Sequence, residues 1–196
     1  MRLLYSAFLF VAIGLVSCNN NNTNTGSEKD NKAQVVNTQA PQSKLNEAGT
    51  QKLVALISDY YSLKDAFVAT KAAVADSAGA RLINSADSLA AFLKTDSANA
   101  PLLKPYLDTI STEAKNLVAL KDESCEKKRL PFSKISDMMF VLLKNAGMKN
   151  AGIYQEYCPM AFDSKGANWL SNDPDIKNPY FGKKMLECGE VTDSLK

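Results

Sequence analysis

Four sulfur-bearing side chains near the C-terminus have the types and the spacing of a soft-metal site. Cys158 and Met160 flank Pro159 in YCPMAF, and the pair returns in reverse order as Met185 and Cys188 in KMLECG. Thiolate and thioether sulfurs select copper(I), whereas imidazole suits zinc and copper(II). The chain contains no histidine, which excludes the commonest general base and every site built on a histidine ligand. The four sulfurs are therefore a candidate copper(I) site.

The spacing of these residues leaves two alternatives open. In an oxidising compartment, Cys158 and Cys188 would be typical of a disulfide, and methionines at such positions often fill a core. Both cysteines could also be buried thiols with no part in binding. Besides Cys18, the third cysteine is Cys125, so at least one thiol stays unpaired in a monomer.

The carboxylates of the same segment predict no acid–base catalysis. Their spacing forms no pair suited to it, and we expect them to be solvated surface groups; they are Asp163, Asp173, Asp175 and Glu187. A reactive cysteine would need a base or positive charge beside it to lower the thiol pKa, and the sequence gives no reason to place one there. We therefore expect a protein that is not an enzyme.

The N-terminus predicts export and a lipid anchor. Arg2 precedes an apolar run over residues 3–17, followed by Cys18, which is the order of a signal peptide. The run is too short to span a bilayer. Residues 15–18, LVSC, resemble a bacterial lipobox, which implies that Cys18 carries lipid. We expect residues 1–17 to be a lipoprotein signal peptide and the mature chain to be anchored in the cell envelope, facing the periplasm.

Composition divides the mature chain into a tether and one domain. Residues 18–44 are rich in Asn, Thr and Gln and lack aromatic residues, so we expect a disordered tether. Residues 45–191 have the length of one domain. The net charge of +2, without a basic run that contains aromatics, argues against nucleic acid as a partner.

Apolar periodicity predicts an all-α fold. Residues spaced by three or four positions define four helical faces, within 53–61, 67–92, 103–118 and 131–146. Pro131 suits the first turn of the fourth helix, and Gly147 suits its C-terminal cap. Short breaks between the stretches predict an antiparallel four-helix bundle.

After residue 150 the helical periodicity stops. The segment is dense in Gly, Pro, Asn and aromatic residues, and DSKG predicts a turn between CPMAF and ANWL that would make a short hairpin. We interpret Trp169, Tyr180 and Phe181 as packing residues rather than a ligand cage. The segment is predicted to be an irregular lid on the bundle.

These motifs together resemble a known family. YCPMAFDSKGANWLS and DIKNPYFGKKMLECGEV resemble the C-terminal signature of the domain-of-unknown-function 3347 family of Bacteroidetes-type exported proteins. YYSLKDAFVATKAAVA and FSKISDMMFVLLKNAG resemble its N-terminal helix pair and its last helix. The resemblance covers most of residues 50–191. The matching signature positions are Cys158, Pro159, Met160, Asn178, Pro179, Tyr180, Phe181, Gly182, Met185, Cys188 and Gly189.

The resemblance implies a role in metal handling. Members occur as small lipoproteins and as C-terminal extensions of periplasmic adaptor subunits of copper and silver efflux systems, and heavy-metal binding is their proposed role. Relatives often carry a histidine near the position of Leu130 or Pro131, which this chain lacks. We therefore expect an envelope lipoprotein that binds copper(I) through sulfur alone, as a buffer or as a donor to an efflux adaptor. The alternative is an interaction module with a Cys158–Cys188 disulfide and an aromatic docking surface.

Overall fold

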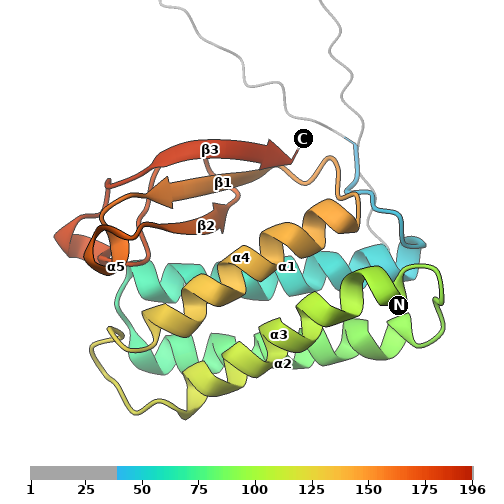
Figure 1. Cartoon of the computed structure of the whole chain (residues 1–196), viewed down its shortest axis with the longest axis horizontal. Coiled ribbons are helices and arrows are strands. Elements are labelled where there is room, and N and C mark those ends of the chain that lie inside the picture. Colours follow the sequence, from blue (N-terminus) through green and yellow to red (C-terminus); the bar gives the residue numbers. More distant parts are fainter. Residues whose placement is uncertain (1–38, 196) are drawn as a thin grey trace, which may run out of the picture. The chain divides into compact units, whose positions relative to one another are not determined.

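Four long helices make up most of the computed structural model, which describes residues 39–195. They are α1 (Glu47–Val68), α2 (Ala72–Leu93), α3 (Ala100–Ala119) and α4 (Arg129–Asn145). Each helix packs against the next, and the colour gradient shows that successive helices run in opposite directions (Figure 1). The prediction of four helices is confirmed. The predicted signal peptide and Cys18 lie outside the described residues.

The helix ends follow local chemistry. The side chain of Asn46 accepts the N–H of Gly49 at 2.9 Å and so caps the start of α1. Gly147 has a φ of +63° directly after α4, as expected for a helix-ending glycine. Phe67 belongs to α1 rather than to the second helix, because the chain turns at Thr70, whose φ is +51°.

The C-terminal part contains a three-stranded sheet, so the prediction of an all-α fold is wrong. Strands β1 (Ile153–Cys158), β2 (Ala167–Ser171) and β3 (Glu190–Leu195) form an antiparallel sheet in the order β2-β1-β3. A short left-handed segment, α5 (Ala161–Ser164), lies between β1 and β2, and a 3-10 helix, η1 (Gly182–Lys184), precedes β3. The predicted hairpin is therefore β1–β2, and β3, whose sequence EVTDSL has no apolar alternation, is not among the predicted elements.

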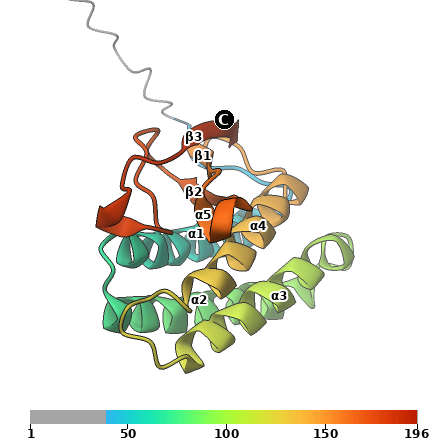
Figure 2. The ribbon, with the colours of Figure 1, turned by 60° about the vertical axis from the view of Figure 1, so that its left-hand side comes forward.

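The sheet lies over α1 and α4, and α2 and α3 lie on the opposite side of that helix pair (Figures 1 and 2). Tyr60 of α1 joins these layers. Its hydroxyl accepts the backbone N–H of Leu170 in β2 at 3.0 Å and shares a 2.7 Å hydrogen bond with Ser136 of α4. This buried network fixes the sheet on the two helices it covers.

The described part of the chain begins before the first helix. Gln42 and Lys149 exchange backbone hydrogen bonds of 3.1 and 2.9 Å, so the chain is already paired three residues before Leu45.

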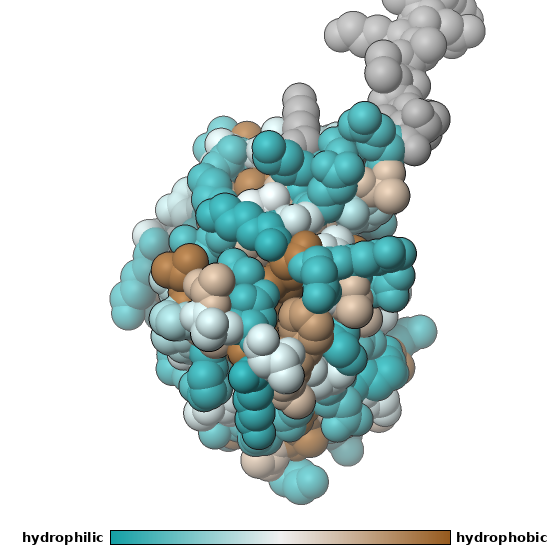
Figure 3. Space-filling model, turned by 90° about the vertical axis from the view of Figure 1, so that its right-hand side faces the viewer, coloured by the Kyte–Doolittle hydropathy of each residue, from teal (hydrophilic) through white to brown (hydrophobic). Residues whose placement is uncertain are grey.

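The end of the molecule with the α2–α3 turn is largely hydrophilic, with a narrow apolar strip at its centre (Figure 3). Within residues 39–195, no helix has the length and hydropathy to cross a bilayer.

Candidate functional site

The structure brings Cys158 and Cys188 together. Cys158 is the last residue of β1 and is fully buried, whereas Cys188 lies in the loop before β3 and is partly exposed. Both thiols are free. The nearby Cys158 thiol raises the pKa of the Cys188 thiol, and partial burial raises it further. Two thiols that are distant in sequence are therefore adjacent, with one of them open to solvent.

Polar groups around Cys188 act in the opposite direction on its pKa. The backbone N–H of Met160 and the side chain of Asn178 lower the pKa of the Cys188 thiol. Such donors stabilise the thiolate form. These two groups therefore oppose the net rise in the pKa of Cys188.

Asn178 holds the loop that carries Cys188. Its side-chain amide donates to the carbonyl of Cys188 at 2.7 Å and its side-chain oxygen accepts the N–H of Tyr180 at 2.7 Å. Its own backbone N–H donates to the carbonyl of Leu186 at 2.7 Å. Asn178 is fully buried, so each of these bonds forms away from water. The position of Cys188 thus depends on Asn178, which is a position of the family signature but not one of the predicted metal ligands.

Gly189 allows the loop to approach the sheet closely. Its φ is +151°, and a Cβ at this position would lie 2.7 Å from the Trp169 ring and 2.9 Å from the carbonyl oxygen of Tyr157. Any other side chain would displace one of these groups. Cys188 is therefore followed by a residue that must be glycine for the thiol to reach β1.

The two methionines lie beside the thiol pair along the chain. Met160 is 51% exposed and Met185 is partly buried; the carbonyl of Met185 accepts the N–H of Cys188 at 3.2 Å. Among residues 39–195, no group of three or more Cys, His, Asp or Glu side chains could hold a metal ion. A metal on the two thiols would thus need a thioether as any third protein ligand.

Cys125 has different surroundings from the pair. It is fully buried in the loop before α4, with a φ of +64°. Burial raises the pKa of its thiol and the nearby Arg129 lowers it, and neither Cys158 nor Cys188 is among the groups that shift it. The third thiol is therefore a natural control for the other two.

A buried carboxyl group, Glu156, lies two residues before Cys158. Burial raises the pKa of Glu156 to about 7, and Lys64 of α1 lowers it less strongly. Trp169, its partner in β2, lies close enough to lower this pKa, but among the described residues neither the carboxyl nor the indole N–H makes a hydrogen bond of regular geometry. Regular pairing with β2 puts Glu156 on the same face of β1 as Cys158. Glu156 is not among the predicted site residues, because a charged side chain in a strand is ordinarily expected on the solvated face.

The fold and this site define a helical domain with a small C-terminal sheet that presents a thiol pair. Residues 56–151 match the model of the family described as "Protein of unknown function (DUF3347)", and the chain belongs to this family. The match spans most of the four helices and ends before β1, so neither Cys158 nor Cys188 lies in the matched part. No curated protein and no solved structure matches the chain.

Proposed function

We propose that the protein binds a soft metal ion, copper(I), through the thiolates of Cys158 and Cys188. The thioethers of Met160 and Met185 are the further ligands in this proposal. The observation that carries it is the proximity of two free thiols, one buried and one partly exposed, of which Cys158 raises the pKa of Cys188. Paired thiolates with neighbouring thioethers are the ligands that copper(I) prefers.

The protein would act as a binding module rather than as an enzyme. Lipid on Cys18 would anchor it in the cell envelope, facing the periplasm, and it would buffer copper(I) or pass it to an efflux adaptor. Its four helices, taken as an antiparallel four-helix bundle, would be the rigid support for the sheet that carries the thiols. Support for this setting comes from the signal-like N-terminus and from the resemblance of the C-terminal motifs.

Copper binding should depend on pH. A thiol binds copper as the thiolate, so binding releases protons. The neighbouring Cys158 thiol raises the pKa of the Cys188 thiol, and copper must displace the Cys188 proton. We expect the apparent affinity to fall as the pH falls, and a pH-independent affinity would argue against thiolate ligands.

A copper(I) titration of the full, reduced chain against a competing chelator tests the proposal. We expect equimolar binding that is lost in Cys158→Ser and in Cys188→Ser and retained in Cys125→Ser. Met160→Leu should weaken binding by less, and Met138→Leu is its control because Met138 is a partly exposed methionine of α4 rather than of the thiol site. An unchanged affinity in a C158S/M160L double variant would refute the site.

The same adjacency favours a second candidate, a disulfide between Cys158 and Cys188. It would fasten the loop before β3 to β1 and make the protein an interaction module with an aromatic docking surface. The mass and free-thiol count of chain extracted without reductant separate the two functions. A disulfide in all of the chain, with no bound metal, would favour this second function, because an oxidised pair supplies no thiolate.

A further inference from the structure

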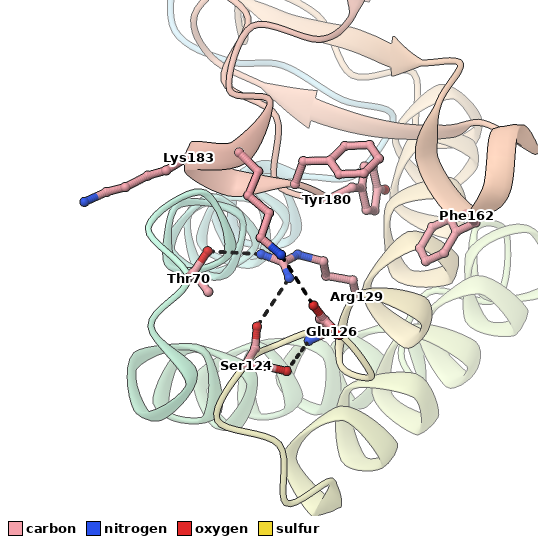
Figure 4. Close-up of a pocket in the computed structure, with 9 residues that line it drawn as sticks. Thr70, Ser124, Glu126, Arg129, Phe162, Tyr180 and Lys183 are labelled. Carbon is pink, nitrogen blue, oxygen red and sulfur yellow. Dashed lines mark hydrogen bonds and ion pairs between the residues drawn. The ribbon is translucent and has the colours of Figure 1, made fainter.

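A pocket of about 610 Å³ lies between the end of α1, the start of α4 and the loop around η1 (Figure 4). This volume is within the range of small-molecule sites, about 300–1,000 Å³. Neither Cys158 nor Cys188 lines it. The pocket is therefore a separate feature of the fold, although η1 forms part of its wall and lies in the same loop as Cys188.

Arg129, the first residue of α4, supplies a buried positive charge to this pocket. Only 7% of Arg129 is exposed. Its Nε donates to the carbonyl of Pro179 at 2.9 Å, and Nη2 donates to the hydroxyl of Thr70 at 3.1 Å. Nη1 and Nη2 make longer bonds of 3.4 and 3.5 Å to the carbonyls of Ser124 and Phe67. Every acceptor is neutral, so within the described chain no carboxylate contacts the guanidinium.

Such an arrangement is costly unless a counter-charge arrives from outside. A buried cation loses its hydration, and neutral carbonyls only partly replace it. Burial accordingly lowers the pKa of the Arg129 guanidinium. The start of α4 adds to the positive potential, since the N-terminal end of a helix carries partial positive charge and no acidic residue occupies the first turn of α4.

The rim of the pocket leaves one positive charge uncompensated. Lys184 lies 3.7 Å from the carboxylate of Glu126, and both side chains are well exposed, so this pair is weak. Glu126 is the one acidic residue among the described residues that line the pocket. The amine of Lys183 points away from the guanidinium (Figure 4). Among the residues that line the pocket, Arg129 and Lys184 therefore face a single carboxylate, Glu126. Asp122 acts on Arg129 from outside the lining.

The opposite wall of the pocket is aromatic. Phe162, Tyr180 and Phe181 line it, and the rings of Phe162 and Tyr180 meet edge to face with centroids 5.4 Å apart. The Tyr180 hydroxyl donates to the carbonyl of Asn168, so that its ring rather than its hydroxyl is available. The pocket thus combines one excess positive charge with apolar surface a few ångströms away.

We propose that this pocket binds a small organic monocarboxylate with an aromatic or branched apolar body. The carboxylate would lie against Arg129 and Lys184, and would replace the long hydrogen bond that Nη1 makes to Ser124. The apolar body would lie against Phe162 and Phe181. This site does not depend on the proposed copper site, because the thiols do not line the pocket.

Binding of 3-phenylpropionate to the full, reduced chain tests the proposal, with 3-phenylpropionamide and inorganic phosphate as matched probes. The fluorescence of Trp169, the sole tryptophan, should report binding because its ring lies 5.9 Å from that of Tyr180. We expect saturable binding of the carboxylate that weakens with salt. Equal binding of the neutral amide or of phosphate, or no binding of the carboxylate at millimolar concentration, would overturn the proposal.

The second test uses variants at the rim of the pocket, because Arg129 is buried and its replacement can unfold the loop. Lys184→Gln should weaken carboxylate binding about threefold, the scale of an exposed charge interaction. Lys183→Gln is the matched control and should bind as the wild type does. Glu126→Gln removes the competing carboxylate and should tighten binding. Equal effects of K183Q and K184Q, or weaker binding by E126Q, would refute the assignment.

A variant of the thiol pair separates this site from the copper site. Cys188→Ser should lose copper(I) and keep carboxylate binding. Loss of carboxylate binding in this variant, with the fold intact by circular dichroism, would place the ligand elsewhere in the loop and overturn the proposed pocket.

Discussion

The helical part and the C-terminal part of the molecule are held together by different kinds of contact. The four helices bury rows of apolar side chains and form backbone hydrogen bonds between residues close in sequence. Residues 153–195 also bury apolar side chains, but their loop depends on two buried polar ones: Asn178, which lies before η1, and Arg129, which reaches over from α4. A change in the helices should therefore lower the stability of the whole domain, whereas a polar change after residue 150 should act on the site.

Shortening a side chain between the helices and the C-terminal part should cause the largest loss of stability. Phe132 of α4 has its ring 4.8 Å from that of Phe67 and 5.8 Å from that of Tyr180. Phe132→Ala should lower the free energy of unfolding by about 3–5 kcal/mol, since it leaves a cavity in a buried cluster. Urea unfolding followed by circular dichroism for the helices and by Trp169 fluorescence for the sheet should show both transitions shifting together. A shift in one probe alone would mean that the two parts unfold independently.

The second prediction concerns pH. The pKa of Glu156 is raised from 4.5 to about 7 by burial, so the folded chain keeps a proton that the unfolded chain releases. The stability from this group is present below pH 4.5 and is lost as the pH rises to about 7. Glu156→Gln should remove this dependence and raise the free energy of unfolding at pH 8 by up to about 3 kcal/mol.

The difference between wild type and E156Q isolates this effect from other titrating groups. Glu187→Gln, an exposed carboxylate of the same region, is the matched control and should leave the pH dependence unchanged. The assignment fails if the wild type and E156Q lose stability in parallel between pH 4.5 and 7.

A smaller and more local effect is expected at Asn178. Asn178→Ala removes the bonds to the Cys188 carbonyl and the Tyr180 N–H, and leaves buried partners unsatisfied at a cost of about 1–3 kcal/mol. Hydrogen exchange should speed up in residues 178–189 and stay unchanged in the helices. Asn172→Ala, an exposed asparagine of the same part, should change neither. Uniformly faster exchange would show that the loop does not open separately.

The smallest loss of stability is expected from replacing a left-handed glycine, and it should be the same in the helical part and in the C-terminal part. Gly147, after α4, and Gly152, before β1, have φ values of +63° and +58°. Alanine at either position should cost about 1–2 kcal/mol from left-handed backbone strain. Thermal unfolding of the two variants measures this cost, and a cost at one position only would point to a contact rather than to the backbone conformation.

Much of the helical part is predictable from the sequence, because a helical face depends on spacing over a few turns. The end of α4 is predictable as well, because glycine readily adopts the left-handed conformation that Gly147 has there. The boundary between α1 and α2 is less predictable: Phe67 continues the apolar spacing, but Thr70 turns the chain. A glycine in a sequence indicates where the backbone can become left-handed, whereas a threonine gives no such indication.

The candidate site is only partly predictable. The types of Cys158 and Cys188 indicate a thiol site, but their adjacency depends on a loop that folds back on β1. Asn178 precedes a proline in NPYFG and is a recognisable turn residue, although its bonds to the Cys188 loop are long-range. Glu156 shares a face of β1 with Cys158 by plain strand alternation, but a charged side chain is ordinarily expected on the solvated face. The role of Arg129 is not predictable from the sequence, because nothing in its spacing distinguishes it from the other basic residues.

X-ray absorption at the copper edge of the copper(I)-loaded full chain tests the proposed site at Cys158 and Cys188 most directly. We predict a first shell of sulfur atoms only, unchanged in Cys125→Ser and lost or rebuilt with lighter scatterers in Cys188→Ser. A shell dominated by nitrogen or oxygen, or one identical in C188S and the wild type, would contradict a site built on Cys158 and Cys188.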